Sequence, residues 1–85
     1  MRDLLFTPVA FEQYNSWQVE NKQVFNKLKK LIKEVAQNPF DGIGKPEALK
    51  HDYAGYWSRR ITDEHRLVYK VENDCIRIVS CKYHY

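Results

Sequence analysis

The sequence predicts an α+β domain in which an N-terminal strand and two helices pack on a mainly antiparallel sheet. Two patterns support this prediction. Apolar residues recur at helical spacing across residues 8–37, and apolar and polar residues then alternate with period two from residue 56 onward. The 85 residues suffice for one hydrophobic core and show neither an internal repeat nor a low-complexity segment. We therefore expect a single domain spanning residues 1–85.

The first strand and the first helix meet at a recognisable boundary. Residues 4–6 are Leu-Leu-Phe and predict a short strand. Thr7 is a natural N-cap, and Pro8 suits the first helical position because the φ angle of proline is already helical. We expect this helix to run to about Glu20. Three aromatic residues lie along one side of it: Phe11, Tyr14 and Trp17.

The second helix is expected from about Asn21 to just before Asn38-Pro39, and its two sides differ in character. A buried stripe is predicted on one side, formed by Val24, Phe25, Leu28, Leu31, Ile32 and Val35. The other side carries a lysine row, which consists of Lys22, Lys29 and Lys33 with Lys27 and Lys30 beside them. A solvated helix face is the favoured interpretation of this row, and contact with RNA phosphate is the alternative.

Residues 41–55 are expected to form a loop because Gly42, Gly44 and Pro46 stand close together among polar residues. Three strands follow, over residues 56–62, 65–71 and 75–82, with turns at 63–64 and 72–74. In the first of them Trp57, Arg59 and Ile61 share one face. The meander and the helices together leave the far face of the sheet open.

Composition indicates a folded protein with a slight basic excess. Hydrophobic residues make up 44% and charged residues 29% of the chain, while the net charge of +3 makes RNA a candidate ligand and no more. No apolar run approaches the roughly 20 residues of a membrane span, so we expect a cytoplasmic protein. Cys75 and Cys81 would lie about 20 Å apart along one strand, so we expect reduced, buried thiols.

Several kinds of site are absent from the sequence. The histidines and cysteines lack the paired spacing of a zinc site, and no acidic cluster suggests magnesium. The segment 42–45, Gly-Ile-Gly-Lys, lacks the spacing of a phosphate-binding loop. Nucleophilic catalysis by a Cys–His pair stays open, although nothing places either thiol in an electropositive, exposed setting. We therefore expect neither a metal nor a cofactor.

The second half of the chain instead concentrates groups suited to metal-free RNA cleavage. That reaction requires a base for the 2′-hydroxyl, a cation for the phosphorane and an acid for the departing 5′-oxygen. Glu47 would serve as the base, Arg66 as the cation and His84 as the acid. The plainer alternatives are a solvated loop carboxylate, a surface ion pair and an ordinary chain terminus.

Five linked motifs carry a resemblance to a known family. They are Gly44-Lys45-Pro46-Glu47, Leu49-Lys50-His51, residues 55–61 (Gly-Tyr-Trp-Ser-Arg-Arg-Ile), residues 64–69 (Glu-His-Arg-Leu-Val-Tyr) and the final Tyr83-His84-Tyr85. In these motifs the sequence resembles the YoeB family, which comprises toxins of bacterial toxin–antitoxin pairs within the RelE-like group. The resemblance implies a small RelE-like domain of the microbial-ribonuclease type.

The family resemblance implies an mRNA interferase that enters the ribosomal A site and cleaves the message there. Its products would carry a 2′,3′-cyclic phosphate, or the hydrolysed form, and a 5′-hydroxyl. Catalytic roles fall on Glu47, Arg66 and His84, and Tyr85 matches the terminal tyrosine that shapes the site. The basic residues expected to bind RNA phosphate are Lys45, Lys50, Arg59 and Arg60.

The resemblance also implies partners. These are a YefM-like antitoxin with a flexible acidic segment, the 70S ribosome with its mRNA, and a second copy of the toxin, because homodimers are common in the family. Two rival hypotheses remain at this point. One is a non-catalytic RNA- or ribosome-binding module of the same fold. The other is a protein-interaction module that uses Tyr53, Tyr56 and Trp57.

Overall fold

The computed structural model describes residues 1–83, so the predicted site residues His84 and Tyr85 lie outside the described residues. The elements, in chain order, are β1 (Asp3–Phe6), α1 (Pro8–Glu20), α2 (Lys22–Gln37), β2 (Glu47–Ala48), a 3₁₀ turn (His51–Tyr53), β3 (Tyr56–Arg60), β4 (Arg66–Val71) and β5 (Cys75–Ser80). Within the described part, neither helix combines the length and the apolar character that crossing a membrane requires.

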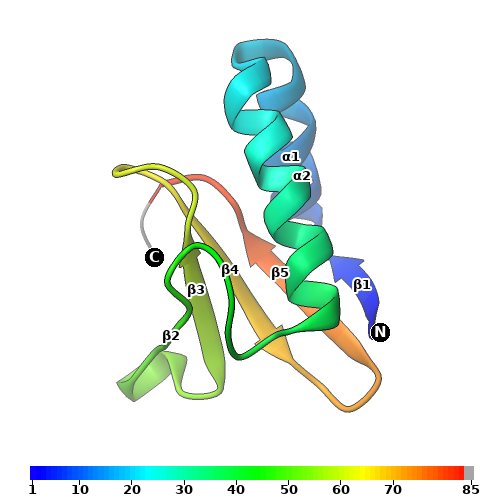
Figure 1. The fold of residues 1–85 in the computed structure, drawn as a ribbon, viewed down its shortest axis with the longest axis vertical. Helices are drawn as coiled ribbons and strands as arrows, with labels where there is room; N and C mark the ends of the chain where they lie inside the picture. The colour runs from blue at the N-terminus through cyan, green and yellow to red at the C-terminus, as the bar shows by residue number, and fades with distance from the viewer. Residues whose placement is uncertain (84–85) are drawn as a thin grey trace.

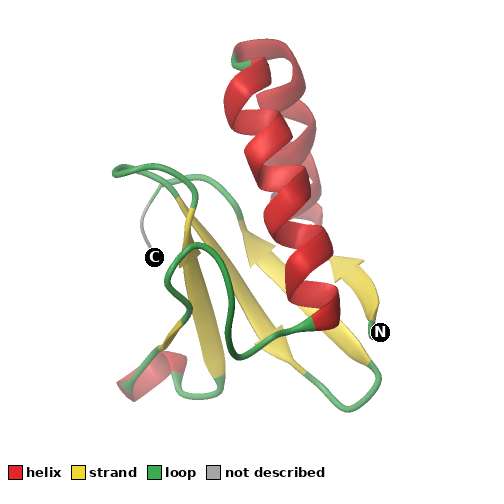
Figure 2. Ribbon diagram, in the orientation of Figure 1, coloured by secondary structure: helices red, strands yellow, loops and turns green. Residues whose placement is uncertain are grey.

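The strands form one sheet in the order β1-β5-β4-β3-β2, and the two helices stand as a hairpin against one face of it (Figures 1 and 2). β1 runs parallel to β5, whereas the other three pairings are antiparallel. A strand followed by two helices and a meander therefore closes into a single layered unit. This arrangement confirms the predicted α+β fold.

The helix boundaries follow from side-chain capping. The Thr7 hydroxyl accepts a hydrogen bond from the backbone N–H of Ala10 at 3.2 Å, and Pro8 begins α1 as expected. Asn21 serves both helices, because its backbone N–H donates to the Trp17 carbonyl while its side chain accepts from Gln23 and Val24. One residue thus ends α1 and begins α2, which forces the two helices into a close hairpin.

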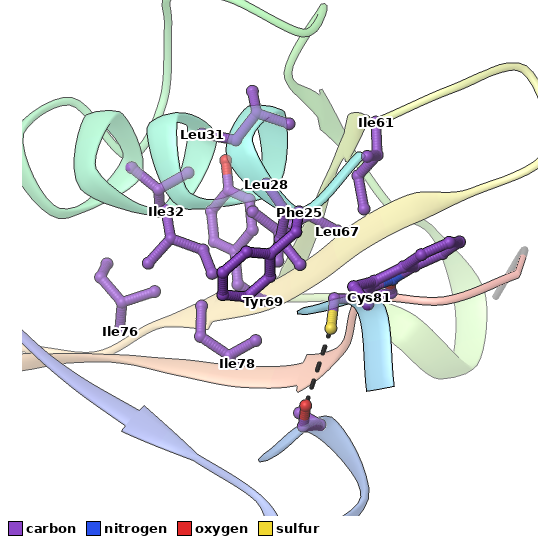
Figure 3. Close-up of a cluster of buried hydrophobic side chains, with 13 residues drawn as sticks. Phe25, Leu28, Leu31, Ile32, Ile61, Leu67, Tyr69, Ile76, Ile78 and Cys81 are labelled. Carbon is purple, nitrogen blue, oxygen red and sulfur yellow. Dashed lines mark hydrogen bonds between the residues drawn. The ribbon is translucent and has the colours of Figure 1, made fainter. Parts of the chain in front are cut away.

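The core lies between α2 and the sheet. Figure 3 shows Leu28 and Ile32 of α2 directed toward Tyr69 and Ile78 of the sheet, and Leu31 is buried in the same cluster. The predicted stripe is therefore the buried one, although Val24 at its edge is only half-buried. On α1 the three aromatics differ: Trp17 is buried, Tyr14 is half-buried and Phe11 is 56% exposed. The predicted aromatic side thus faces the core only at Trp17 and Tyr14.

Three local features differ from the sequence-based expectation. The expected loop at residues 41–55 contains β2, because Glu47 and Ala48 pair with Ser58 and Trp57. The strand predicted to reach residue 82 ends at Ser80, since the next backbone N–H, that of Cys81, donates to the Gln13 side chain of α1 instead. Both thiols are free, as expected, but only Cys81 is buried, while Cys75 is half-buried.

Truncating Leu28, which has no exposed surface, should lower the free energy of unfolding by about 2–5 kcal/mol because it opens a cavity between α2 and the sheet. Chemical denaturation of Leu28→Ala measures this loss. The matched control is Lys27→Ala, an exposed neighbour on the same helix, which should change stability by less than about 0.5 kcal/mol. Equal effects of the two substitutions would contradict the packing described here.

Candidate functional site

Strand register places the predicted base and the predicted cation on the same face of the sheet. Glu47 pairs with Ser58, Ser58 with Val68, and Arg60 with Arg66. Residues opposite one another in a sheet point to the same side, and residues two apart along a strand do so as well. Glu47, Arg60 and Arg66 therefore share the face turned away from the helices.

Glu47 and Arg66 sit on β2 and β4, the two strands that flank β3. Two strand spacings of about 10 Å across the sheet and an offset of two residues, about 7 Å along β4, put their Cα atoms roughly 12 Å apart. Glu47 and Arg60 are exposed, and Arg66 is half-buried. Among residues 1–83 no ion pair joins Glu47 to Arg66. The carboxylate and the guanidinium thus share one face of the sheet without neutralising each other.

The Arg66 guanidinium is held at the turn that precedes β4. Its Nη1 atom donates to the carbonyl oxygens of Thr62 at 2.6 Å, Asp63 at 3.1 Å and His65 at 3.1 Å. Nε and Nη2 make no hydrogen bond to the described residues, so two N–H-bearing nitrogens of the fork remain for an anion. Arginine presents these donors in a geometry that matches phosphate oxygens.

The residue that precedes His84 is anchored beside Arg66. The backbone N–H of Tyr83 donates to His65 Nδ1 at 2.7 Å, and the Tyr83 carbonyl accepts from the Arg66 N–H at 3.1 Å. The His65 ring contacts Trp17 edge-on at 4.7 Å between centroids and lies 5.4 Å from the Tyr83 ring. Figure 1 shows this red segment running beside the yellow turn between β3 and β4. His65 lies inside one of the family motifs, but its sequence pattern gave no reason to assign it this anchoring role.

Helix α1 holds the same C-terminal segment from the other side. Trp17 Nε1 donates to the Cys81 carbonyl at 2.9 Å. The Lys82 ammonium forms an ion pair with Glu20 and lies 4.9 Å from the Trp17 ring centroid. The hydrogen bond from Lys82 is the main reason why the pKa of Glu20 lies below its usual value. Desolvation acts in the opposite direction, and the charge of Lys82 and the Ser16 contact add to the lowering. Aromatic and polar contacts from two sides therefore hold residues 81–83 in place.

The Glu47 side of the site is an open depression of about 520 Å³ lined by residues 47–53. Lys50, which belongs to this lining, and Lys45, which precedes it in the chain, are both exposed. Lys45 adopts a left-handed backbone conformation with φ of 52°, which is costly for a residue with a Cβ and recurs at functional sites. The structure therefore leaves Lys45, Lys50 and Arg60 accessible for a polyanion.

Arg59 does not belong to this surface. Its side chain is 0% exposed and faces the helices, where it forms an ion pair with Glu34 at 3.1 Å. It has no surface with which to contact RNA phosphate, which corrects the role expected from its basic character. The sequence already indicated this burial, because Arg59 shares a strand face with Trp57 and Ile61, and that face packs inward.

The thiols are poorly suited to nucleophilic catalysis. Burial raises the pKa of the Cys81 thiol to about 12. Partial desolvation, together with the Glu72 carboxylate that accepts its hydrogen bond, raises the pKa of Cys75. Both cysteines therefore stay protonated near neutral pH, and the thiolate is the reactive form. Among residues 1–83, no group of three His, Cys, Asp or Glu side chains is arranged to hold a metal ion.

Comparison with known proteins identifies the family. The model of the YoeB-like toxin of bacterial type II toxin–antitoxin systems matches residues 6–85. Toxin YoeB of Escherichia coli K12 is 48% identical over 82 residues, which cover 96% of this chain and 98% of that toxin. This chain belongs to the YoeB-like toxin family. A YoeB toxin of Streptomyces coelicolor is also 48% identical, over the same shares of the two chains.

Solved structures agree with this assignment to the YoeB family. A YoeB/ParE toxin from Agrobacterium tumefaciens superposes with a TM-score of 0.92 at 41% identity, covering 98% of this chain and 99% of that one. The YoeB dimer from Staphylococcus aureus gives 0.90 at 48% identity, covering 99% and 98%. YafQ from E. coli, at 22% identity and a TM-score of 0.81, shares the fold.

The two cysteines of this YoeB-family toxin should differ in reactivity. At about pH 8, a thiol-alkylating reagent should modify Cys75 slowly and leave Cys81 intact in the native protein, because only Cys75 is partly exposed and both thiols are protonated. Both should react once denaturant is added. Peptide mass spectrometry reads out each site, and rapid native labelling of Cys81 would contradict its burial.

Proposed function

We propose that this YoeB-family toxin is a metal-independent endoribonuclease that inhibits translation by cleaving mRNA in the ribosomal A site. The observation that carries the proposal is that Glu47 and Arg66 share one face of the sheet. In addition, Tyr83, the residue before His84, is hydrogen-bonded to the Arg66 backbone. Glu47 and Arg66 thereby face the same side of the sheet, and His84 follows directly after the anchored Tyr83 in the sequence. Each belongs to a chemical class that the reaction requires.

The proposed reaction is a transesterification within the RNA. Glu47 accepts the proton of the 2′-hydroxyl while the 2′-oxygen forms a bond to the adjacent phosphorus. The phosphorane carries additional negative charge, which the free side of the Arg66 guanidinium stabilises. His84 donates a proton to the 5′-oxygen as the P–O5′ bond breaks. The products are a 2′,3′-cyclic phosphate and a 5′-hydroxyl, and no oxidant, reductant or external nucleophile is consumed.

The residues around this centre would hold the message rather than transform it. Lys45, Lys50 and Arg60 are exposed and would supply positive charge for backbone phosphates. Tyr85 would shape the wall of the site next to His84, as the terminal tyrosine of the family does. Arg59 is left out of this RNA-binding set because it is buried.

The ribosome would supply the positioning that the toxin lacks. A net charge of +3 gives weak binding to free RNA at physiological salt, because affinity rises with the number of phosphates neutralised. A message fixed in the A site no longer has to be oriented by the toxin alone. Holding reactants in register can lower a barrier by about 7–11 kcal/mol in favourable cases. Action on ribosomes also places the toxin in the cytoplasm.

We further propose that a YefM-like antitoxin with an acidic flexible segment neutralises this toxin. Support comes from the relatives. Staphylococcus aureus provides a YoeB–YefM complex and a heterotetrameric YoeB–YefM complex, and the chains matched in them are 49% and 48% identical to this one. A YoeB dimer from the same organism supports a homodimer as a further assembly. The exposed lysine row of α2 offers positive charge to an acidic segment or to ribosomal RNA.

Three substrates test the reaction: one message bound to ribosomes, the same message free, and the ribosome-bound message with a 2′-deoxynucleotide at the cut site. Cleavage of the first should be fast, cleavage of the second much slower, and cleavage of the third absent, since no 2′-oxygen is present to attack. Product ends are read by gel mobility and phosphatase sensitivity, and the slow cleavage of the free message is compared with and without a chelator because ribosomes themselves need Mg²⁺. Continued cutting of the deoxy substrate would overturn the mechanism, and equal rates with free message would remove the ribosome from it.

Substitution of Glu47 or His84 separates an enzyme from a non-catalytic RNA- or ribosome-binding module. Glu47→Gln and His84→Ala should each slow cleavage by about 10²–10⁴-fold, because each removes one proton-transfer group. Circular dichroism should show an unchanged fold. Glu12→Gln, an exposed glutamate on α1, is the matched control and should retain full activity. Growth inhibition that persists in both catalytic variants would favour the binding module.

A further inference from the structure

The buried Arg59 side chain is the centre of a hydrogen-bonded cluster beneath the loop that leads to Glu47. Its Nε atom donates to the Tyr69 hydroxyl at 3.1 Å, and Nη1 contacts the Glu34 carboxylate at 3.1 Å. The remaining donors reach three backbone carbonyls: Asp41 at 2.9 Å, Ile43 at 3.2 Å and, at shorter range, Asn38. Every guanidinium nitrogen therefore has a partner.

The carbonyl acceptors of this cluster all belong to one segment, residues 38–43, which connects α2 to the strand β2 that carries Glu47. A fourth carbonyl of the segment, that of Pro39, accepts from the Tyr69 hydroxyl at 2.8 Å. Loop carbonyls that turn inward have no water to bind and need internal donors. Arg59 and Tyr69 supply these donors, so the path of the loop depends on them.

The end of the loop lies directly against Arg59. Gly44 has a φ of 84°, and a Cβ built there would come within 3.2 Å of Arg59 Cβ and 2.9 Å of a Leu31 methyl group. The Gly44 carbonyl accepts from the Arg60 N–H at 2.7 Å. Strand β3 therefore bonds to the loop in two ways. The Arg59 side chain donates to loop carbonyls from the interior, and the Arg60 backbone N–H donates to the Gly44 carbonyl. Lys45 follows at once.

We propose that Arg59 is a positioning residue for RNA cleavage: its buried guanidinium, held by Glu34 and Tyr69, fixes loop 38–44 and thereby sets Lys45 and Glu47 against the substrate. This proposal rests on the ribonuclease function proposed above. Arg59 itself touches no RNA. It acts through the backbone of the loop.

Arginine suits this position for a physical reason. A buried cation is tolerated only when its charge is balanced and its donors are bonded, and the Glu34 side chain, 22% exposed, provides the balance. The planar fork reaches acceptors in several directions at once. Lysine would bring the same charge with a single nitrogen, which can serve only part of this set of carbonyls. Arg59→Lys therefore keeps the positive charge but removes the donors that reach several carbonyls at once.

The experiment compares Arg59→Lys with wild type by two measurements. Hydrogen exchange followed by mass spectrometry reports opening of residues 38–46, and initial rates on ribosome-bound message give kcat and KM separately. Loop exchange should become about tenfold faster while β4 and β5 stay protected. kcat should fall about tenfold to 100-fold, as expected for a misplaced catalytic group, and KM should change less than about threefold. Arg77→Lys, which alters an ion pair with Glu72 on the sheet surface, is the control and should change neither.

A second variant keeps the proposal testable if Arg59→Lys does not fold. Tyr69→Phe removes only the hydroxyl that links Arg59 to Pro39. It should also speed loop exchange and lower kcat, but by less than Arg59→Lys. Unchanged loop exchange, or a rise in KM with kcat intact, would overturn the positioning role. If wild type cleaves no message, the ribonuclease proposal fails, whereas loop exchange in these variants still decides whether Arg59 anchors the loop.

Discussion

The pairing of β3 with a strand on each side is the constraint on which the site depends. Glu47 on β2 and Arg66 on β4 have no direct contact, and their relation exists only because both strands are in register with β3. Side chains along a strand alternate between faces, so a slip of one residue would turn either group toward the helices. The two-residue strand β2 is short, and the hydrogen bonds that Arg59 and Arg60 make to the preceding loop reinforce its register.

The two neighbouring arginines of β3 show how this alternation divides chemically identical residues. Arg60 is exposed on the face shared with Glu47, whereas Arg59 is buried among helix and loop groups. Adjacent positions in one strand thus provide a surface charge and an internal anchor. The toxin's C-terminal segment is held by side chains from two parts of the chain: Trp17 and Glu20 of α1, and His65 before β4, contact residues 81–83.

The helices and the meander could be predicted because their signals are local. Thr7, Pro8 and Asn21 mark helix ends through their own side chains and backbone, and period-two alternation marks β3 and β4. β2 was missed for the opposite reason. Two residues carry no periodicity, and Glu47-Ala48 becomes a strand only when Ser58 and Trp57 are beside it. The early end of β5 likewise depends on Gln13, a side chain from the far end of the chain.

The sequence by itself determined the fold class, the family and the chemical classes available for the reaction. These follow from residue identity and short-range spacing, which need no knowledge of distant contacts. Only the tertiary structure decided which of those residues share a surface. Glu47 and Arg66 face the same side of the sheet. Arg59, one of the basic residues expected to bind RNA, is instead buried. Burial and register are properties of segments packed together, so a charge that is identical in sequence becomes a surface group or an internal support according to what the fold brings against it.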